Sequence, residues 1–360
     1  MRVVVVGATG NIGTSVVSAL AGEPAVTSVL GVARRGPSTL PPGVEFAGAD
    51  VRGDDLAPLF RNADAVVHLA WLFQPTHRPE VTWRANVIGT QRVLTAVAAA
   101  GVPAVVCASS IGAYSPARDD RPVDESWPTD GWPLAAYTRE KAYVERVLDA
   151  FATEHPETRV VRMRPSFVFQ RASASEQRRL FAGPLVPHPL VRPGVVPILP
   201  LPRGLRMQAL HSHDAGRAFA RAVVSEVDGA FNIAADPVLD RERLGEIFGA
   251  RTVEVPPSAV RAALTTAWRL RLAPTPPGLF DALLRLPIMD TSRARTELDW
   301  TPRHTATDTL REMLDGFQAN AGGDTPPLAP DAGGRWRIRE FASGVGGRDP
   351  VDQWGAAAAH

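Results

Sequence analysis

Lysine is nearly absent from this sequence of 360 residues. Of its 39 lysine and arginine residues, Lys141 is the single lysine and all the others are arginine. An ammonium group is a compact cation, whereas the guanidinium of arginine is a broad planar fork, so the two are not interchangeable at a binding site. A lone lysine in an arginine-rich chain therefore indicates a position where arginine does not suffice.

Other absences exclude several classes of protein. The single cysteine, Cys107, permits no disulfide within the chain and is expected to be a buried, inert thiol. No uninterrupted apolar stretch reaches membrane-spanning length, so no membrane span is expected. The formal net charge of +1 gives no basic excess, which argues against nucleic acid as a partner. The apolar run directly after Arg2 leaves no signal-peptide pattern, and we expect a cytoplasmic protein. The residues His188, His211 and His213 are too scattered to predict a metal site.

Two kinds of sequence pattern alternate over the first 165 residues. Short valine-rich runs cover residues 2–6, 28–33, 64–70, 103–110 and 159–165. Segments with helical spacing lie between them, at 12–22, 54–62, 86–101 and 138–155. Continuous apolar strands separated by helices are typical of a parallel sheet covered on both faces. With right-handed crossovers, the pattern predicts an α/β fold built on a Rossmann-type doubly wound parallel sheet.

This alternation ends after residue 165, which indicates that the chain contains more than one domain. We expect a dinucleotide-binding domain over residues 1–165, to which residues 205–235 return. A smaller C-terminal substrate-binding subdomain is predicted from 166–204, within which 171–204 reads as a loop-rich insertion, and from 236–318. Gly, Pro and Asp dominate from 319 to 360, so this tail is expected to be mobile, with Trp336 and Trp354 as residues that could dock elsewhere.

A glycine-rich turn follows the first predicted strand. In GATGNIG, Gly7 would allow the sharp turn, Gly10 the close approach of a pyrophosphate, and Gly13 the packing of the helix on the sheet. The pyrophosphate would lie at the helix N-terminus, where free N–H groups favour an anion. The G-x-x-G-x-x-G spacing differs from the commonest dinucleotide fingerprint, and a plain tight turn is the alternative.

The end of the second predicted strand selects the cofactor. An acidic residue there would bind the ribose 2′-hydroxyl of NAD, but this chain has Arg34 and Arg35. Guanidinium groups bind a 2′-phosphate, so the sequence favours NADP(H), with NAD(H) as the second choice. The alternative is that both are solvated surface arginines.

Tyr137 and Lys141 are four residues apart on a predicted helix, which places both on one face. A tyrosine with an ordinary pKa near 10 is a poor acid or base at neutral pH, and a nearby ammonium is expected to lower that pKa. Ser109 and Ser110 follow the strand that begins near residue 103, at the edge of the sheet where ligands bind. Either could bind a substrate oxygen, and for Ser109 we favour a structural role in capping the next turn.

Together, these segments resemble the extended short-chain dehydrogenase/reductase family, which contains nucleotide-sugar epimerases and dehydratases. The segments that carry the resemblance are GATGNIG (7–13), Asp50 with Val51, VVHLAW (66–71), NVIGT (86–90), SSIGAY (109–114), PVDESWP (122–128), YTREK (137–141), RPSFVF (164–169), LHSHDAGRA (210–218) and LDWTPR (298–303). Phe169 and Gln170 depart from the family's Tyr-Gly, and His213 stands where the family has an Asp.

The resemblance implies roles for individual residues. Tyr137 would be the general acid/base, Lys141 would lower its pKa and hold the nicotinamide ribose, and Ser110 would bind the substrate oxygen. A homodimer through 86–101 and 138–155 is also implied. The cofactor-binding residues would be Gly7, Thr9, Gly10, Asn11, Ile12, Gly13, Arg34, Arg35, Asp50, Val51, Leu69, Ala70, Ala108, Lys141, Pro165, Phe167 and Val168.

The residues after the serine narrow the reaction. Related dehydratases carry an acid pair there, whereas this chain has Ile111 and Gly112, so dehydration is disfavoured. An NAD(P)-dependent epimerase or alcohol/ketone oxidoreductase remains, acting on a small-molecule substrate. That substrate would be sugar-nucleotide-like, or an apolar alcohol if the apolar segment 267–289 forms a pocket rather than packing on the sheet. Arg261, Arg269, Arg271 and Arg285 would meet a substrate diphosphate or cover an outer face. A catalytically silent NADP-binding sensor or scaffold is the alternative.

Overall fold

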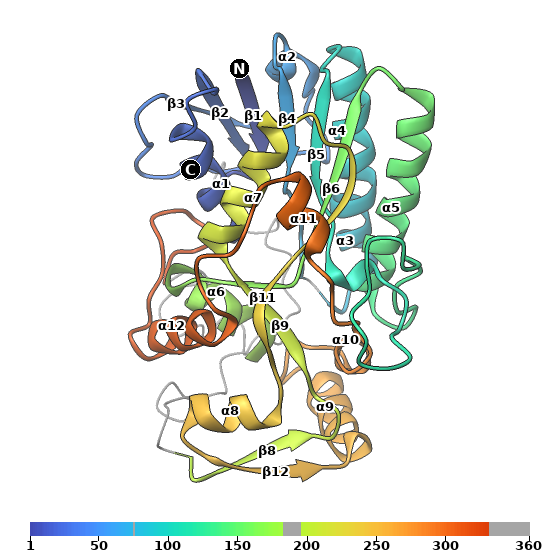
Figure 1. The fold of residues 1–360 in the computed structure, drawn as a ribbon, viewed down its shortest axis with the longest axis vertical. Coiled ribbons are helices and arrows are strands. Elements are labelled where there is room, and N and C mark those ends of the chain that lie inside the picture. Colours follow the sequence, from blue (N-terminus) through green and yellow to red (C-terminus); the bar gives the residue numbers. More distant parts are fainter. Residues whose placement is uncertain (75, 183–195, 331–360) are drawn as a thin grey trace.

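The structure is a computed structural model that describes residues 1–74, 76–182 and 196–330. Residues 75, 183–195 and 331–360 lie outside the described part, and with them His188, Trp336 and Trp354. The elements run in chain order through the colours of Figure 1. The strands are β1 Arg2–Val6, β2 Ser28–Ala33, β3 Val44–Gly48, β4 Ala65–His68, β5 Ala104–Ala108, β6 Arg159–Pro165, β7 Phe167–Phe169, β8 Ile198–Pro202, β9 Met207–His211, β10 Gly229–Ile233, β11 Ala235–Leu239 and β12 Arg251–Val255. The α-helices are α1 Asn11–Ala21, α2 Ala57–Phe60, α3 Pro79–Trp83, α4 Gly89–Ala99, α5 Ala136–Glu154, α6 Ala174–Gln177, α7 Ser212–Val224, α8 Arg241–Phe248, α9 Pro257–Arg269, α10 Pro277–Leu283, α11 Ser292–Glu297 and α12 Ala306–Gln318. Short 3₁₀ or π-helical turns are η1 Arg84–Ile88, η2 Ile111–Ala113, η3 Arg171–Ser173 and η4 Arg178–Ala182.

The main sheet has seven parallel strands in the order β10-β6-β5-β4-β1-β2-β3. The order reverses between β1 and β4, because the chain leaves β1 toward β2 on one side and returns to β4 on the other. Such a switch point leaves a crevice at the carboxyl ends of the strands. The predicted Rossmann-type α/β fold is confirmed; the edge strand β3 was not among the predicted strands.

Valine alternation in β1 shows why both faces of this sheet are covered. Successive side chains of a strand point to opposite faces. Val3 and Val5 pack in the core that holds α1 and α7, whereas Val4 and Val6 pack in the core that holds α4 and α5. All four are at most 1% exposed, so β1 lies at the centre of a three-layer fold.

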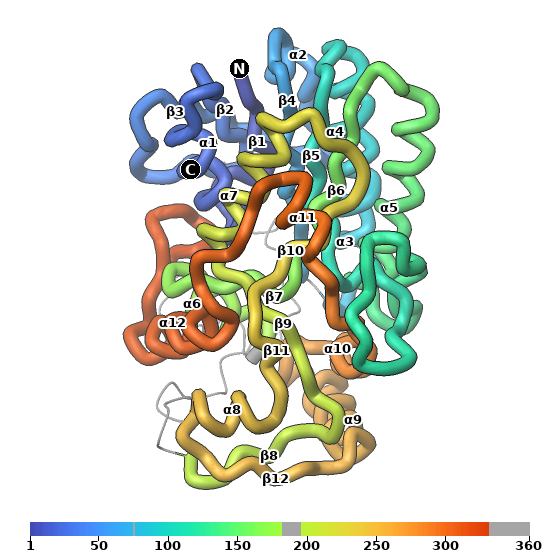
Figure 2. Tube along the Cα trace, viewed as in Figure 1, coloured from blue at the N-terminus to red at the C-terminus, as the bar shows by residue number. Residues whose placement is uncertain are grey.

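Two smaller sheets lie outside the main one. The first has the order β11-β9-β7, and the second pairs β12 with β8. Figure 2 traces the chain from β8, in the lower part of the molecule, along β9 to α7. The predicted loop-rich insertion contains η3, α6, η4 and β8 within its described residues, and the boundaries of the two predicted domains stay a prediction. Among the helices that the structure describes, none combines the length and apolarity needed to cross a membrane.

Candidate active site

The glycine-rich turn after β1 is formed as predicted. Gly7 has φ +91°, and a Cβ there would lie 2.6 Å from the backbone nitrogen of Ala70. A Cβ at Gly13 would collide with the Gly7 carbonyl oxygen. Glycine is therefore required at both positions, because the turn is pressed between the end of β4 and the start of α1.

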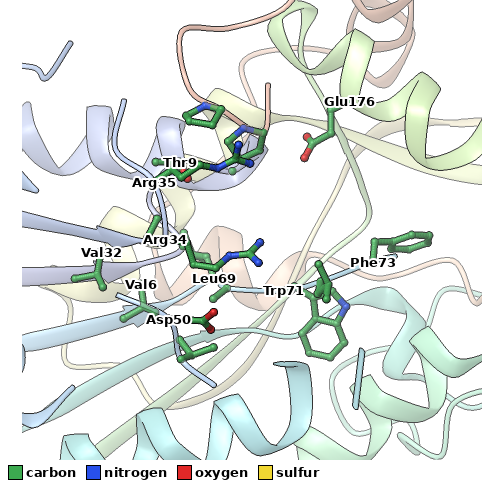
Figure 3. A pocket seen from close by; sticks show the side chains of 18 of the residues that line it. Val6, Thr9, Val32, Arg34, Arg35, Asp50, Leu69, Trp71, Phe73 and Glu176 are labelled. Carbon is green, nitrogen blue, oxygen red and sulfur yellow. The ribbon is translucent and has the colours of Figure 1, made fainter. Parts of the chain in front are cut away.

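A cavity of about 530 Å³ lies at the carboxyl ends of β1, β2 and β4. Figure 3 shows side chains of residues that line it. Nine of the predicted cofactor-binding residues line this cavity: Gly7, Thr9, Gly10, Arg34, Arg35, Asp50, Val51, Leu69 and Ala70. The crevice at the switch point is thus enclosed by the residues that the sequence indicated for the glycine turn and for the adenosine end of a dinucleotide.

The other predicted cofactor residues do not line this cavity. They are Asn11, Ile12, Gly13, Ala108, Lys141, Pro165, Phe167 and Val168. The amide of Asn11 instead donates to the Val168 carbonyl oxygen (2.9 Å), because β7 leaves the main sheet and runs past the start of α1. Phe167 and Val168 pair with β9 in the small sheet.

Sequence reasoning missed several residues that do line the cavity. Trp71 lay within a quoted motif, but no role was predicted for it. The others are Val6, Val32, Ala33 and Ala49 at or near the ends of strands; Leu72, Phe73 and Gln74 after β4; Glu176, Arg179 and Leu180 in or after α6; and Pro326, Pro327 and Ala329 near the end of the described chain. The last two groups lie in the loop-rich segment 171–204 and in the C-terminal tail. Neither segment has a local sequence pattern that indicates a ligand.

The charges on the cavity wall favour a phosphate ligand. Burial opposes ionisation of Asp50, but hydrogen bonds from Arg52 and the positive charges of Arg52 and Arg34 hold the Asp50 pKa below its usual value. Burial raises the pKa of Glu176 to about 7. Because Glu176 is therefore only partly ionised at neutral pH, the arginines on the wall dominate its charge.

Ser110 and Tyr137 are brought together at the carboxyl end of β5. The Tyr137 hydroxyl donates to Ser110 Oγ at 3.0 Å, and the Gly112 backbone N–H donates to the same oxygen at 2.9 Å. Ser109, one residue earlier, faces another partner and donates to Glu145 Oε1 at 2.5 Å. Ser110 is therefore the serine next to Tyr137, and Ser109 bonds to a buried carboxylate instead of capping the next turn.

The buried carboxylate of Glu145 links α5 to the carboxyl end of β5 and to β6. Its side chain is fully buried, and Arg164 donates to both of its oxygens, at 2.9 and 3.0 Å. Although burial opposes ionisation, these bonds and the charge of Arg164 keep the Glu145 pKa below its ordinary value. Cys107 in β5 is buried, as predicted, and burial raises its pKa to about 12.

Lys141 does not point into the cavity. Its ammonium donates to the Ala108 carbonyl oxygen at 2.8 Å, and Nζ lies 3.4 Å from the centroid of the Trp71 ring. The residue is 3% exposed, and burial lowers the Lys141 pKa to about 7.

The Tyr137 pKa differs from the expectation. Burial raises it, and the hydrogen bond with Ser110 only partly opposes the rise. The physical reason is that the ammonium is directed toward the Ala108 carbonyl and the Trp71 ring, with Nζ 5.9 Å from the centroid of the Tyr137 ring.

An aromatic layer stands between the cavity and Tyr137. The ring of Trp71 meets that of Tyr137 edge-on, with centroids 5.9 Å apart, and Phe73 lies 5.2 Å from Tyr137. Trp71, Leu72 and Phe73 line both the large cavity and a hollow of about 30 Å³ that Tyr137 borders on the other side. This segment therefore separates the predicted catalytic pair from the predicted cofactor cavity.

A buried polar network holds this layer against α5. The Asn86 side chain bonds to both the N–H and the carbonyl of Leu72, at 2.6 and 2.8 Å. Its amide also donates to Glu140 (2.7 Å), whose second oxygen accepts from Thr82 (2.6 Å). Burial raises the pKa of Glu140 despite these bonds. Asn86 was part of a quoted motif, whereas nothing marked Glu140 except its place before Lys141.

The comparison with protein families decides the assignment. A family described as the NAD dependent epimerase/dehydratase family matches residues 3–234. The chain belongs to this family. The resemblance found in the sequence is confirmed at this level.

Individual relatives agree with the family. The uncharacterized protein Rv0501 of Mycobacterium tuberculosis is 27% identical over 97% of this chain and 92% of its own length. Among solved structures, MoeE5 in complex with UDP-glucuronic acid and NAD is 23% identical, with a TM-score of 0.65, over 89% of this chain and 100% of that one. DesIV, a dTDP-glucose 4,6-dehydratase of Streptomyces venezuelae solved with NAD, is 22% identical, with a TM-score of 0.64, over 89% and 98%. At this identity, the two structures show the fold that the chain shares with them.

Proposed function

We propose that this family member is an NAD(P)-dependent oxidoreductase or epimerase that acts at an alcohol or ketone carbon through Ser110, Tyr137 and Lys141. The observation that carries the proposal is the 3.0 Å hydrogen bond from Tyr137 to Ser110. It lies at the carboxyl edge of the sheet, beside the cavity lined by the glycine turn. The proposal needs Tyr137 to exchange a proton with the substrate oxygen.

The proton chemistry follows from the hydrogen bonds of Ser110. Its oxygen accepts from Gly112 and Tyr137, so its own hydrogen is directed to a third group, the substrate oxygen. Tyr137 passes its proton to that oxygen when a carbonyl is reduced and takes it back when an alcohol is oxidised. The nicotinamide, when bound, supplies or accepts the hydride at the adjacent carbon.

The cavity would accept the adenosine and pyrophosphate of a dinucleotide, and Gly7, Thr9 and Gly10 would hold the pyrophosphate. Arg34 and Arg35 support a preference for NADP(H), because both line the cavity at the end of β2. The relatives named above were solved with NAD, so NAD(H) is the second candidate.

The proposed substrate is a sugar nucleotide or an apolar alcohol. MoeE5 and DesIV support the first class. Pro276 and Leu279, which border the small hollow beside Tyr137, support the second. Of the four arginines considered for a diphosphate, Arg261 is paired with Asp281 at 2.8 Å, and Arg285 lies over the Trp132 ring. Dehydration is less favoured, because Ile111 and Gly112 follow the serine where related dehydratases carry acids.

One observation favours a second function, that of a catalytically silent dinucleotide-binding sensor. The indole of Trp71 covers Lys141, and burial raises the pKa of Tyr137. A protein with this arrangement would bind the cofactor without turnover unless Trp71 moves.

Turnover separates the two functions. Nucleotide sugars and apolar ketones are screened for oxidation or reduction of NADP(H), followed by absorbance at the nicotinamide band. With the substrate so found, Tyr137→Phe should abolish turnover and leave NADPH binding nearly unchanged. The control is Tyr143→Phe, which alters a half-exposed tyrosine on the same helix. Full activity of Tyr137→Phe would disprove the catalytic role of this tyrosine.

A further inference from the structure

The last described residues, 324–330, lie across the cavity, and we call them the C-terminal strap. Pro326, Pro327 and Ala329 of the strap contribute to the cavity wall. The same wall includes Thr9 of the glycine turn and Arg179 of η4. The strap follows α12, a helix that lies beside α6 at the left of Figure 1. A segment more than 300 residues distant in sequence from the glycine turn thus shares its cavity.

The strap is anchored by hydrogen bonds to three other segments of the chain. Thr325 Oγ1 donates to the Thr9 carbonyl oxygen at 2.7 Å, in a buried contact. Arg179 donates to the Pro327 carbonyl oxygen at 2.8 Å. At the outer end, Ser38 donates to the Asp324 carbonyl oxygen at 3.4 Å. These anchors join the strap to the glycine turn, to the helical segment after α6 and to the loop that follows Arg34 and Arg35.

The strap has a defined local structure. The backbone N–H groups of Leu328 and Ala329 both donate to the Thr325 carbonyl oxygen at 2.9 Å, and Gly323 donates to the Leu328 carbonyl. Leu328 is 2% exposed, which is the burial of a core residue. A Cβ at Gly322 would lie 2.5 Å from the Leu328 carbonyl oxygen, so glycine is required where the chain turns back. Burial of one leucine and three anchoring hydrogen bonds hold a segment that has neither helix nor strand.

The chemistry of the strap suits one part of a dinucleotide. Its prolines present apolar rings and no N–H groups, so they suit a ribose or an adenine face rather than a phosphate. The phosphates would instead meet the glycine turn and the arginines on the remaining wall.

We infer that residues 324–330 form part of the dinucleotide-binding site and that the Thr325–Thr9 contact sets how fast the dinucleotide leaves. The inference rests on the proposed function, since it takes the cavity to be the dinucleotide site. Because the strap and the glycine turn share both a hydrogen bond and the cavity, a ligand that contacts both stabilises the closed strap. By the reciprocity of coupled equilibria, the closed strap then stabilises the bound ligand.

The test uses the full-length chain and NADPH. Nicotinamide fluorescence gives the affinity, and displacement of NADPH by excess NADP⁺ in a stopped-flow instrument gives the dissociation rate. Thr325→Val removes the hydroxyl and keeps the shape, so NADPH should dissociate roughly three to ten times faster, as expected for the loss of one buried hydrogen bond. Thr325→Ser keeps the hydroxyl and should restore the rate.

Thr158→Val is the matched control. Thr158 is 6% exposed and donates to the Val102 carbonyl oxygen at 3.2 Å, away from the cavity. It loses the same kind of bond as Thr325→Val, so it should be destabilised similarly while its NADPH dissociation rate stays unchanged. Equal dissociation rates in Thr325→Val and Thr158→Val would overturn the inference.

A second measurement needs no variant. Hydrogen exchange of the Leu328 and Ala329 amides should slow when NADPH saturates the unaltered chain, because the closed strap protects them. Unchanged exchange at both amides would contradict the inference. A failure of the unaltered chain to bind either NADPH or NADH would instead remove the proposed function itself, and the first titration distinguishes that result from a failure of the strap alone.

Discussion

The ammonium nitrogen of Lys141 lies 3.4 Å from the centroid of the Trp71 indole, and it donates to the Ala108 carbonyl oxygen at the same time. Tryptophan is the aromatic side chain that attracts a cation over its face most strongly. The proposed contact of Lys141 with a nicotinamide ribose competes with this contact. Cofactor binding through this proposed contact would therefore include the cost of displacing the indole.

Trp71→Leu should tighten NADPH binding, because the indole no longer has to leave the ammonium. The cation–π contact is worth about 0.5–2 kcal/mol, so the dissociation constant should fall by about fivefold. Isothermal titration calorimetry measures the change. Trp83→Leu, which instead removes a tryptophan whose ring centroid lies 4.8 Å from that of Tyr143, should leave the constant unchanged. Weaker binding in Trp71→Leu would mean that the indole supports the cofactor rather than competing with it.

Lys141→Met should stabilise the protein at neutral and lower pH. The Lys141 pKa is about 7 in the folded chain and about 10.4 when unfolded, so the unfolded chain binds one more proton between these values. The stability of the unaltered protein therefore rises with pH across that window, and the burial cost is fully present below pH 7. The gain from methionine should be on the order of a few kcal/mol at pH 6–7, reduced by loss of the Ala108 hydrogen bond, and should shrink toward pH 10.

Urea unfolding of both proteins at pH 6, 8 and 10 measures this difference, and other titrating groups cancel in the comparison. A difference that stays constant with pH would show that Lys141 keeps an ordinary pKa. Lys141→Met should at the same time be inactive in the turnover assay, since the proposed function needs the ammonium.

Glu176→Gln should remove a pH dependence of cofactor affinity. The Glu176 pKa is about 7, so its carboxyl is neutral below pH 7 and carries a negative charge above it. That charge repels the pyrophosphate, and the affinity of the unaltered chain for NADH should fall severalfold between pH 6 and pH 8. NADH is the probe because it lacks a 2′-phosphate that titrates in this range.

Asp50→Asn is the control for this prediction. The Asp50 pKa lies below its usual value, so this carboxylate stays ionised from pH 6 to pH 8. Its replacement should shift NADH affinity equally at every pH and leave the slope intact. The same slope in Glu176→Gln as in the unaltered chain would contradict the assigned pKa.

Replacing Arg34 and Arg35 together by alanine should change the choice of cofactor. Two guanidinium groups at a 2′-phosphate make charge-assisted hydrogen bonds, so NADPH affinity should fall by about a hundredfold while NADH affinity changes little. Arg121→Ala removes an exposed arginine paired with Asp119 and serves as the control for a lost positive charge. Equal losses for both dinucleotides would place the two arginines on the pyrophosphate or outside the site.

Local patterns in the sequence predicted the fold, and nine of the seventeen cofactor-binding residues that they indicated line the cavity. The four valines of β1 indicated a strand buried on both faces, and the spacing of Gly7, Gly10 and Gly13 located the turn that the structure forms. The four-residue spacing of Tyr137 and Lys141 placed them on one helix, but only the packed chain decides where each side chain points. The Lys141 ammonium lies over the Trp71 indole, and no local sequence pattern predicts this contact.

The C-terminal strap is a second example of structure that local sequence patterns do not predict. Gly, Pro and Asp after residue 319 led to the expectation of a mobile tail, and the described residues 319–330 contain neither helix nor strand. Leu328 is buried by the tertiary packing of the chain, which composition alone does not predict. The remainder of the predicted tail, from residue 331, lies outside the described part of the chain.

The near absence of lysine has a practical consequence. Lys141 carries the only side-chain primary amine in the sequence, and it is covered by an indole. A pKa of about 7 keeps a large part of this amine in its nucleophilic, uncharged form at neutral pH, so access rather than protonation limits its reaction. A reagent that acylates lysine side chains can therefore modify one atom of this protein, Lys141 Nζ. The rate of that modification measures how readily the Trp71 indole moves away from the amine.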